Sequence, residues 1–447
     1  MVSSRQSGPP ARKGHETVIP RCRRFDRQLH QALQIDESTS KQIEASVDAI
    51  LAQVREGGDT ALRRLVAQYD GIACDTVADL LISKNDMALA CERLSPEINE
   101  ALQHAAARIR SYHGRQHEEQ ATDWRFEDEL GNVLGQRISP MSRVGVYAPG
   151  GKASYPSTIL MTAIPAKVAG VPEVVLAVPA DKQSIDPVLL AAAHYAGVDE
   201  LYTMGGAQAI GALAYGCQTI QRVDKICGPG NLYVATAKRR VFGEVGIDMV
   251  AGPSEVLVVA DAKTRIDWVA DDVLAQAEHD ELAQSIVVST DGVVLEAIRE
   301  AVLHRLQSSK RKEIASASIM NRGLLIKTCD EAGTVNVIDR VAPEHLELSV
   351  EDPDALMAYP LRAGAVFVGE HSPEVVGDYS AGPSHVLPTS GSARFASALG
   401  TYDFVTRQSV IQCHRSGVIP LAKSAAILAE AEGLDMHAAS AYRRIEG

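Results

Sequence analysis

Residues 143–178, RVGVYAPGGKASYPSTILMTAIPAKVAGVPEVVLAV, decide the fold class. They hold an apolar run at 144–147, a helical stretch at 156–169 and a second apolar run at 174–178. A strand, a helix and a strand in this order form a βαβ unit, and such units build parallel sheets. The stretch therefore predicts an α/β domain.

The alternation continues towards the C-terminus in two series. The first adds helical stretches at 186–196 and 205–215 and strands at 201–204 and 225–227. The second has predicted strands at 255–259, 285–289, 324–327 and 365–368. We therefore predict an α/β protein with two parallel sheets and helical extensions at both ends.

Helical segments flank both series. Residues 37–70 predict two helices separated at Gly57-Gly58, another helix is expected at 96–113, and residues 415–445 are Ala-rich and helical. The expected parts are an N-terminal arm at 1–35, a first α/β domain at 36–142 plus 253–390, a second at 143–252 and a helical C-terminal extension at 391–447.

Size and composition exclude several classes of protein. A chain of 447 residues exceeds a single core. Its net charge of −13 argues against a nucleic-acid partner. No apolar run reaches the roughly 18 residues that span a bilayer, and the basic first 28 residues lack the apolar core of a secretory signal. The seven scattered cysteines contain no CxxC, so we expect a cytoplasmic protein with reduced thiols.

Two glycine-rich loops follow predicted strands, APGGK at 148–152 and CGPGN at 227–231. Glycine allows close backbone approach to a ligand, and a following helix N-terminus favours anions. Neither the phosphate-binding GxxxxGK[ST] pattern nor GxGxxG is present, because Lys152 precedes Ala153 and the glycines of 205–211 are misspaced. Tight structural turns explain each loop equally well, but several loops at adjacent strand ends favour a ligand crevice, with a dinucleotide as a plausible ligand.

Glu344 and His345 adjoin each other in APEHLEL, residues 342–348. Imidazole titrates near neutral pH and suits proton transfer, and a neighbouring carboxylate can orient it or share the proton. Most such pairs are solvated surface residues. The dyad becomes a candidate site because other ligand-type side chains accompany it, namely Gln276, His279, Asp378, His385 and His437.

These side chains include four candidate metal ligands. Gln276 and His279 are three residues apart in a predicted helix, so both lie on one face. Asp378, in a predicted loop, offers an oxygen, and His437 follows Glu432 by five residues. Without thiolates, zinc favours imidazole nitrogen and carboxylate oxygen. Spacing alone does not connect these four residues, and a lone helical histidine is more often structural.

Six motifs together resemble the histidinol dehydrogenase family. They are VGVYAPGGK at 144–152, KICGPGN at 225–231, AGPSE at 251–255, AQAEHD at 275–280, APEHLE at 342–347 and HVLPT at 385–389. The resemblance covers roughly residues 20–447 in the family's order. It implies oxidation of L-histidinol to L-histidine through an aldehyde, with two NAD, as the last step of histidine synthesis.

The resemblance also implies site residues. Zinc would be held by Gln276, His279, Asp378 and His437, the substrate would also meet Ser254, Glu344, His345, His385 and Glu432, and NAD would meet Tyr147, Gln208 and Asn231. His437 and Glu432 would come from the partner in an intertwined homodimer, with 391–447 used in dimerisation. The fold that the resemblance implies has two incomplete Rossmann-like parallel-sheet domains, an aldehyde-dehydrogenase-like architecture, with helical N- and C-terminal extensions. The domain at 36–142 plus 253–390 would carry the metal and catalytic residues, and 143–252 would bind NAD.

The resemblance also implies separate catalytic roles for Glu344 and His345. His345 would remove the alcohol proton as hydride leaves to NAD, and Glu344 would activate the water that attacks the bound aldehyde. Ser384 departs from the family pattern, in which Asn commonly precedes the histidine, and this loosens the assignment of His385 to the substrate.

Three alternatives remain. A paralogous zinc- and NAD-dependent dehydrogenase would oxidise another amino or sulfonated alcohol. Cys227 could act as a thiolate nucleophile, although a buried structural thiol fits its apolar strand better. A non-catalytic zinc-bound scaffold would have no need for the Glu344-His345 pair beside glycine loops. The sequence leaves open whether zinc or manganese is the physiological metal.

Overall fold

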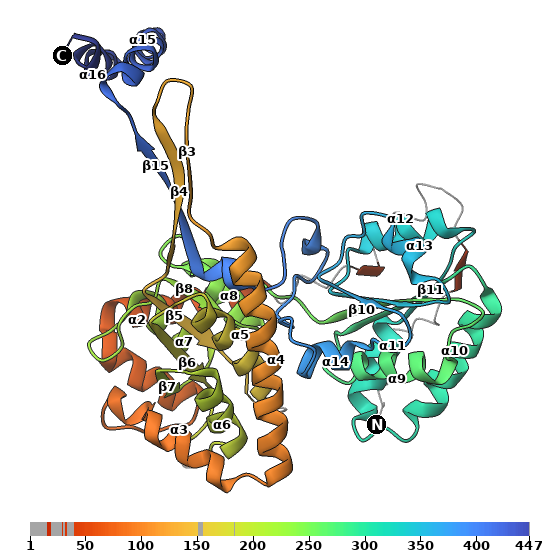
Figure 1. Ribbon diagram of the computed structural model, residues 1–447. Coiled ribbons are helices and arrows are strands. Elements are labelled where there is room, and N and C mark those ends of the chain that lie inside the picture. The colour runs from red at the N-terminus through yellow and green to blue at the C-terminus, as the bar shows by residue number, and fades with distance from the viewer. Residues whose placement is uncertain are drawn as a thin grey trace, which may run out of the picture.

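Two six-stranded sheets, called sheet A and sheet B below, dominate the molecule and lie side by side with their helices in Figure 1. The computed structural model describes residues 16–18, 29, 32–33, 40–150, 155–182 and 184–446. A smaller three-stranded sheet projects from the body as an arm. The α/β class with two parallel-sheet units is confirmed.

Sheet B contains the βαβ unit predicted at 143–178. Its order is β2-β7-β6-β5-β8-β9, and every pair except β2–β7 is parallel. The strands are β2 (Leu81–Ile82), β5 (Arg143–Tyr147), β6 (Glu173–Val178), β7 (Glu200–Thr203), β8 (Lys225–Cys227) and β9 (Gly246–Ile247). Its helices are α2 (Ser40–Tyr69), α3 (Lys84–Ala90), α4 (Pro96–Gln120), α5 (Pro156–Val168), α6 (Pro187–Ala196), α7 (Gly206–Tyr215) and α8 (Leu232–Val241). Strands β5 and β6 are almost wholly buried, as expected for parallel strands covered on both faces.

Sheet A is parallel throughout, with the order β1-β12-β11-β10-β13-β14. The strands are β1 (Glu16–Val18), β10 (Glu255–Ala260), β11 (Gln284–Ser289), β12 (Leu324–Lys327), β13 (His345–Ser349) and β14 (Ala365–Val368). Its helices are α9 (Ile266–Ala277), α10 (Gly292–Leu306), α11 (Lys312–Arg322), α12 (Glu331–Val341), α13 (Pro353–Met357) and α14 (Glu374–Tyr379).

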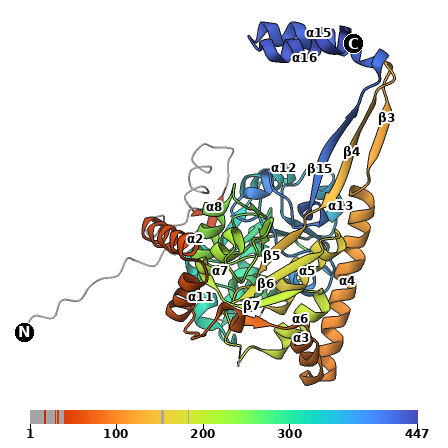
Figure 2. The same cartoon turned by 90° about the vertical axis from the view of Figure 1, so that its left-hand side faces the viewer.

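The arm consists of β3 (Trp124–Glu127), β4 (Val133–Pro140) and β15 (Val405–Gln412). Strand β15 runs antiparallel to β4 with Val405 opposite Pro140 and Gln412 opposite Val133. Two helices, α15 (Arg415–Ala431) and α16 (Asp435–Glu446), form a hairpin at the far end of the arm (Figure 2). The extension at 391–447 is therefore not wholly helical, because its exposed strand completes the arm.

The eight predicted strands are present, with ends shifted by no more than one residue. The two predicted N-terminal helices form α2, which is interrupted at Gly58 by a left-handed φ of 51°. The sequence prediction missed the remaining strands, namely β1, β2, β9 and β13 of the two large sheets and β3, β4 and β15 of the arm. Short 3-10 turns at Val77–Leu80, Cys91–Arg93, Ser392–Arg394 and Thr401–Phe404 complete the described elements.

Two predicted domain boundaries are wrong. Residues 40–120 pack mainly on sheet B and not on sheet A: Val47 and Leu62 share a core with Val175 of sheet B, and Ile109 shares another with Val146. The apolar stripe of a helix shows which face is buried, not which sheet it covers. The predicted N-terminal arm at 1–35, a different segment from the three-stranded arm, includes β1, which pairs with β12, and the buried Leu29. The rest of 1–35, apart from 32–33, lies outside the described residues.

No helix within the described residues is long and apolar enough to cross a membrane.

Candidate active site

His345 is the first residue of β13 and lies buried at the amino end of sheet A. Its Nδ1 lies 3.0 Å from the carbonyl oxygen of Glu255. A carbonyl only accepts, so Nδ1 carries the proton and Nε2 is the basic nitrogen. Nε2 makes no hydrogen bond to the described residues, and Oδ1 of Asp378 lies 3.5 Å away. Nε2 is therefore the nitrogen at which the ring gains or loses its second proton.

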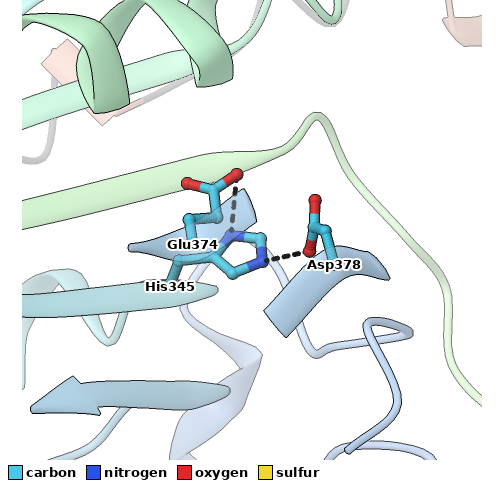
Figure 3. Close-up of side chains that lie close together, drawn as sticks. All are labelled: His345, Glu374 and Asp378. Carbon is cyan, nitrogen blue, oxygen red and sulfur yellow. Dashed lines mark ion pairs between the residues drawn. The ribbon is translucent and has the colours of Figure 1, made fainter. Parts of the chain in front are cut away.

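Two carboxylates of α14 flank the imidazole (Figure 3). Glu374 and Asp378 are four residues apart, so both lie on the helix face that meets His345. Oε1 of Glu374 lies 3.9 Å from Nδ1 of His345. Burial by itself would lower the pKa of His345, but the carboxylates of Glu374, Glu344 and Asp378 outweigh it and hold that pKa well above its ordinary value. Asp378 was expected in a loop and instead belongs to this short helix, whose six residues are too few to show a periodic pattern.

Glu344 precedes β13 and is buried beside His345. Its Oε2 accepts a 2.9 Å hydrogen bond from the backbone nitrogen of Glu255, and lies 3.8 Å from Nδ1 of His345. Burial raises the pKa of Glu344 to about 8, against the opposing effects of His345 and that hydrogen bond. The predicted dyad is thus a buried pair rather than a solvated surface pair.

His279 and His385 lie near the same carboxylate. Nδ1 of His385 donates to the carbonyl oxygen of Asp378 at 3.0 Å, and its Nε2 faces the hydroxyl of Thr158 at 3.2 Å. Nδ1 of His279 is 3.3 Å from the carbonyl oxygen of Gln276, which leaves Nε2 as the possible metal donor. Burial would raise the pKa of Asp378, but the close approach of the His345 ring at 3.5 Å and the nearby charges of His385, His345 and His279 lower it overall.

The site lies between the two halves of the molecule, because Thr158 belongs to α5 of the sheet B half. Ser384 reinforces the junction: its hydroxyl donates to the carbonyl oxygen of Met161 at 3.0 Å and accepts from the backbone nitrogen of Val386. Ser384 therefore anchors the His385 segment to α5. A cavity of about 390 Å³ opens beside these residues, lined by His345, Asp378 and His385 and by apolar side chains, among them Phe367, Val376 and Leu387.

The donor atoms fit a divalent cation. One possible ligand atom each of His345, Glu374 and Asp378 lies within 4.8 Å of the others. Imidazole nitrogen together with carboxylate or amide oxygen is a zinc-type ligand set. Of the four predicted ligands, Gln276, His279 and Asp378 are brought to this site. Gln276 is buried against Glu374, and His279 acts electrostatically on Asp378. His279 lies just beyond the end of α9 rather than within the helix.

Glu432 and His437 do not reach the site within one chain. Glu432 directly follows α15 and His437 lies in α16, both exposed on the hairpin at the far end of the arm (Figure 1). The hairpin also exposes large apolar side chains, including Ile427, Leu428 and Met436. Ser254 lies immediately before β10, where its carbonyl oxygen accepts from the backbone nitrogen of Gln284.

The three predicted NAD residues lie at the carboxyl edge of sheet B. Tyr147 ends β5, Gln208 begins α7 after β7, and Asn231 precedes α8 after β8. Each has a structural role: Tyr147 Oη accepts from the backbone nitrogen of Gly206, Gln208 donates to Asp70, and Asn231 caps α8. This edge is where open α/β sheets bind ligands.

The glycine loops at that edge suit close approach by a ligand. Gly228 has a φ of 113°, and a Cβ there would lie 2.1 Å from the carbonyl oxygen of Tyr147, so only glycine fits. Gly151 and Lys152 of the first loop lie outside the described residues. Cys227 is fully buried, and burial raises the pKa of its thiol well above the ordinary value, which disfavours a thiolate nucleophile.

Sequence reasoning missed three buried carboxyl groups, those of Glu255, Glu347 and Glu374. Glu347 accepts from the backbone nitrogen of Glu374 at 2.6 Å, and Glu255 from that of Ser390 at 3.1 Å. Burial raises the pKa of Glu255 to about 7 and that of Glu347 to about 8. For Glu255 and Glu347 the only sequence signal was a charged residue in an otherwise apolar strand, as in HLELS at 345–349, whereas Glu374 lies in the short helix α14.

Comparison with known proteins identifies the family. A family model described as histidinol dehydrogenase matches residues 33–445. The chain belongs to the histidinol dehydrogenase family. The chain is 52% identical over 424 residues to a histidinol dehydrogenase of Psychrobacter arcticus, covering 94% of this chain and 98% of that protein. It is 50% identical over 421 residues to one of Pseudomonas syringae pv. syringae, covering 94% and 93% of the two chains. Histidinol dehydrogenases are oxidoreductases.

The crystal structure of a histidinol dehydrogenase from Elizabethkingia anophelis is also similar. It is 32% identical in sequence, covers 97% of this chain and 98% of its own, and superimposes with a TM-score of 0.88. The family resemblance drawn from the six motifs is therefore confirmed, and the two-sheet fold with its projecting arm belongs to the histidinol dehydrogenase family.

Proposed function

We propose that this chain oxidises L-histidinol to L-histidine through the bound aldehyde, with two NAD as electron acceptors and one zinc ion per subunit. The observation that carries the proposal is the orientation of His345. Its Nδ1 donates to Glu255, and its basic Nε2 lies beside Asp378 at the edge of a 390 Å³ cavity. Family membership supplies the substrate class, and the site supplies the groups that the chemistry needs.

His345 is the general base for the alcohol in this proposal. As the C–H bond transfers its hydride, the O–H proton must leave to a group within hydrogen-bond reach, and Nε2 of His345 can take that role once it has given up its own proton. His385 is held by Asp378 and Thr158 and borders the cavity, where it would contact the substrate.

Glu344 serves the second oxidation. The aldehyde must take up water before a second hydride can leave, and a carboxylate with a pKa of about 8 is a competent proton acceptor in mildly alkaline solution. Its hydrogen bond to the backbone of Glu255 keeps the other carboxylate oxygen available for water.

The proposed zinc ligands are Gln276, His279 and Asp378 from one chain and His437 from a second copy. Bound zinc would hold the nitrogen atoms of histidinol and so fix the alcohol carbon for reaction. Ser254 and the Glu432 of the second copy complete the proposed substrate contacts. Manganese, whose ligand preferences overlap, remains an alternative metal.

The proposed NAD site is the carboxyl edge of sheet B at Tyr147, Gln208 and Asn231. NAD bound there would accept both hydrides. Glycine at positions 205, 206 and 228 keeps this edge free of side chains, as a nucleotide lying against the backbone requires.

The proposed assembly is an intertwined homodimer in which each arm reaches the other subunit. It is supported by the projection of the hairpin away from its own body and by the exposed Ile427, Leu428 and Met436 (Figure 2). We also propose that the protein is located in the cytoplasm.

A substrate screen tests the function. Purified protein with zinc and NAD should reduce NAD with L-histidinol at a rate far above that with other amino alcohols or with sulfonated propanediols. A preference for one of those alcohols would favour the alternative, a paralogous dehydrogenase. No NAD reduction with any of them would reject both.

A further inference from the structure

The side chain of Gln276 is buried, and its amide group meets both carboxylate oxygens of Glu374. With its nitrogen facing Glu374, Gln276 donates hydrogen bonds of 2.8 Å to Oε1 and 3.1 Å to Oε2. The opposite placement would press the amide oxygen against two acceptors, and that arrangement is repulsive. The nitrogen therefore faces Glu374, and the amide oxygen points away from it.

This orientation matters for a metal ligand. An amide binds a hard or borderline cation through oxygen, because its nitrogen carries two protons and has no free lone pair. A free glutamine side chain could present either end to a cation. A carboxylate at a fixed place on the other side removes that freedom, as partners behind metal ligands generally do.

Glu374 is itself fixed. It is buried at the start of α14, and its backbone nitrogen donates to Oε1 of Glu347 at 2.6 Å. Glu347 lies in the middle of β13, two residues after His345 and on the same face of the strand. Glu374 also shares its helix face with Asp378, one turn away. A single short helix thus supplies one proposed ligand and the partner of another.

We propose that Glu374 is a positioning residue that turns the oxygen of Gln276 towards the metal. The inference rests on the proposed metal site. Glu374 acts through Gln276 and is not itself a ligand in this account, although its carboxylate lies within 4.8 Å of the donor atoms of His345 and Asp378.

A double-mutant cycle on zinc affinity separates the two roles. The dissociation constant for zinc is measured by chelator competition on the full-length wild-type protein, Glu374→Ala, Gln276→Ala and the double variant. We expect Glu374→Ala to weaken zinc binding about 10–100-fold, as loss of a partner behind a ligand does. In the Gln276→Ala background, Glu374→Ala should raise the zinc dissociation constant by no more than about threefold, because the amide that Glu374 positions is gone.

Two further variants serve as controls. Glu374→Gln keeps an acceptor oxygen for Gln276 and should fall between wild type and Glu374→Ala, which keeps the inference testable if the alanine variant does not fold. Glu347→Gln removes the charge of a neighbouring buried carboxyl group that makes no hydrogen bond to Gln276. The glutamine keeps an oxygen that can accept from the backbone nitrogen of Glu374. This variant should weaken zinc binding less than Glu374→Ala does, because the hydrogen bonds between Gln276 and Glu374 are kept.

The outcomes are distinct. If Glu374→Ala weakened zinc binding equally in the wild-type and Gln276→Ala backgrounds, Glu374 would act as a ligand or through its charge. That result would overturn the inference. Unchanged affinity in Glu374→Ala, with tight binding by the wild type, would also overturn it while leaving the proposed function intact. A wild-type protein that binds no zinc would overturn the metal site and this inference together.

Discussion

Nδ1 of His345 donates its proton to the carbonyl oxygen of Glu255 across 3.0 Å. The two residues start neighbouring parallel strands, β13 and β10, so the sheet itself fixes the imidazole. Because the carbonyl can only accept, Nε2 is left as the nitrogen that takes up the substrate proton.

Replacement of His345 by Asn should therefore remove proton transfer without removing the metal. We expect turnover with L-histidinol to fall by about 10²–10⁴. Zinc content, measured by elemental analysis, should stay at the wild-type level, since His345 is not among the proposed ligands. A His345→Asn protein with normal turnover would rule out His345 as the base.

The second oxidation should depend on pH through Glu344. A base acts when deprotonated, and burial raises the pKa of this carboxyl from 4.5 to about 8. The rate of oxidation of L-histidinal should therefore rise with pH towards about 8 and level off above it. In Glu344→Gln the rate should be much lower and this rise should vanish. A rise that persists unchanged in the variant would assign the water-activating step to another group.

Metal removal should destabilise the protein most in alkaline solution. Burial raises the pKa of Glu344 and of Glu347 from 4.5 to about 8, so between these values the folded chain binds more protons than the unfolded chain. The free energy of unfolding of the metal-free protein must then fall as pH rises through that range. A bound cation replaces those protons as the source of positive charge.

Thermal unfolding checks this expectation. The Tm of chelator-treated protein should drop more between pH 6 and pH 8.5 than the Tm of zinc-loaded protein. In Glu347→Gln, which carries one ionisable carboxyl fewer, the drop should be smaller. Equal pH dependence with and without zinc would contradict the view that the cation balances these carboxyl groups.

Complementation should reveal a site shared between subunits. His345→Asn and His437→Ala should each be nearly inactive alone. In a heterodimer, the subunit with an intact His345 receives an intact His437 from its partner. Unfolding and refolding an equal mixture should therefore recover about a quarter of the wild-type activity, since half of the dimers are mixed and each has one complete site. No recovery, from a mixture shown to contain mixed dimers, would place His437 in its own subunit's site.

Eight strands of the two large sheets were predictable because buried parallel strands are continuous apolar runs, as in β6 and β10. The edge strands β1, β2 and β9 have only two or three residues each and form no such run. Strand β13 was missed because His345 and Glu347 interrupt its apolar residues. Their burial depends on partners from β10 and α14 that are distant in sequence.

The same limit applies to the site. Glu344, His345, Asp378 and His385 were singled out by residue type and connected to one site through the resemblance to a family, and the fold brings them together. Glu374 matched no motif, and its role depends on a contact with Gln276 across 98 positions of chain. The packing of α2 and α4 on sheet B was likewise missed, since the apolar face of a helix does not indicate which sheet it packs against.

The central claim is a four-electron oxidation within one site. It is tested most directly by counting NADH formed per L-histidinol consumed, with L-histidine identified as the product. The account predicts two NADH for each L-histidinol, with no free aldehyde trapped in solution. One NADH per L-histidinol, with the aldehyde released, would contradict it.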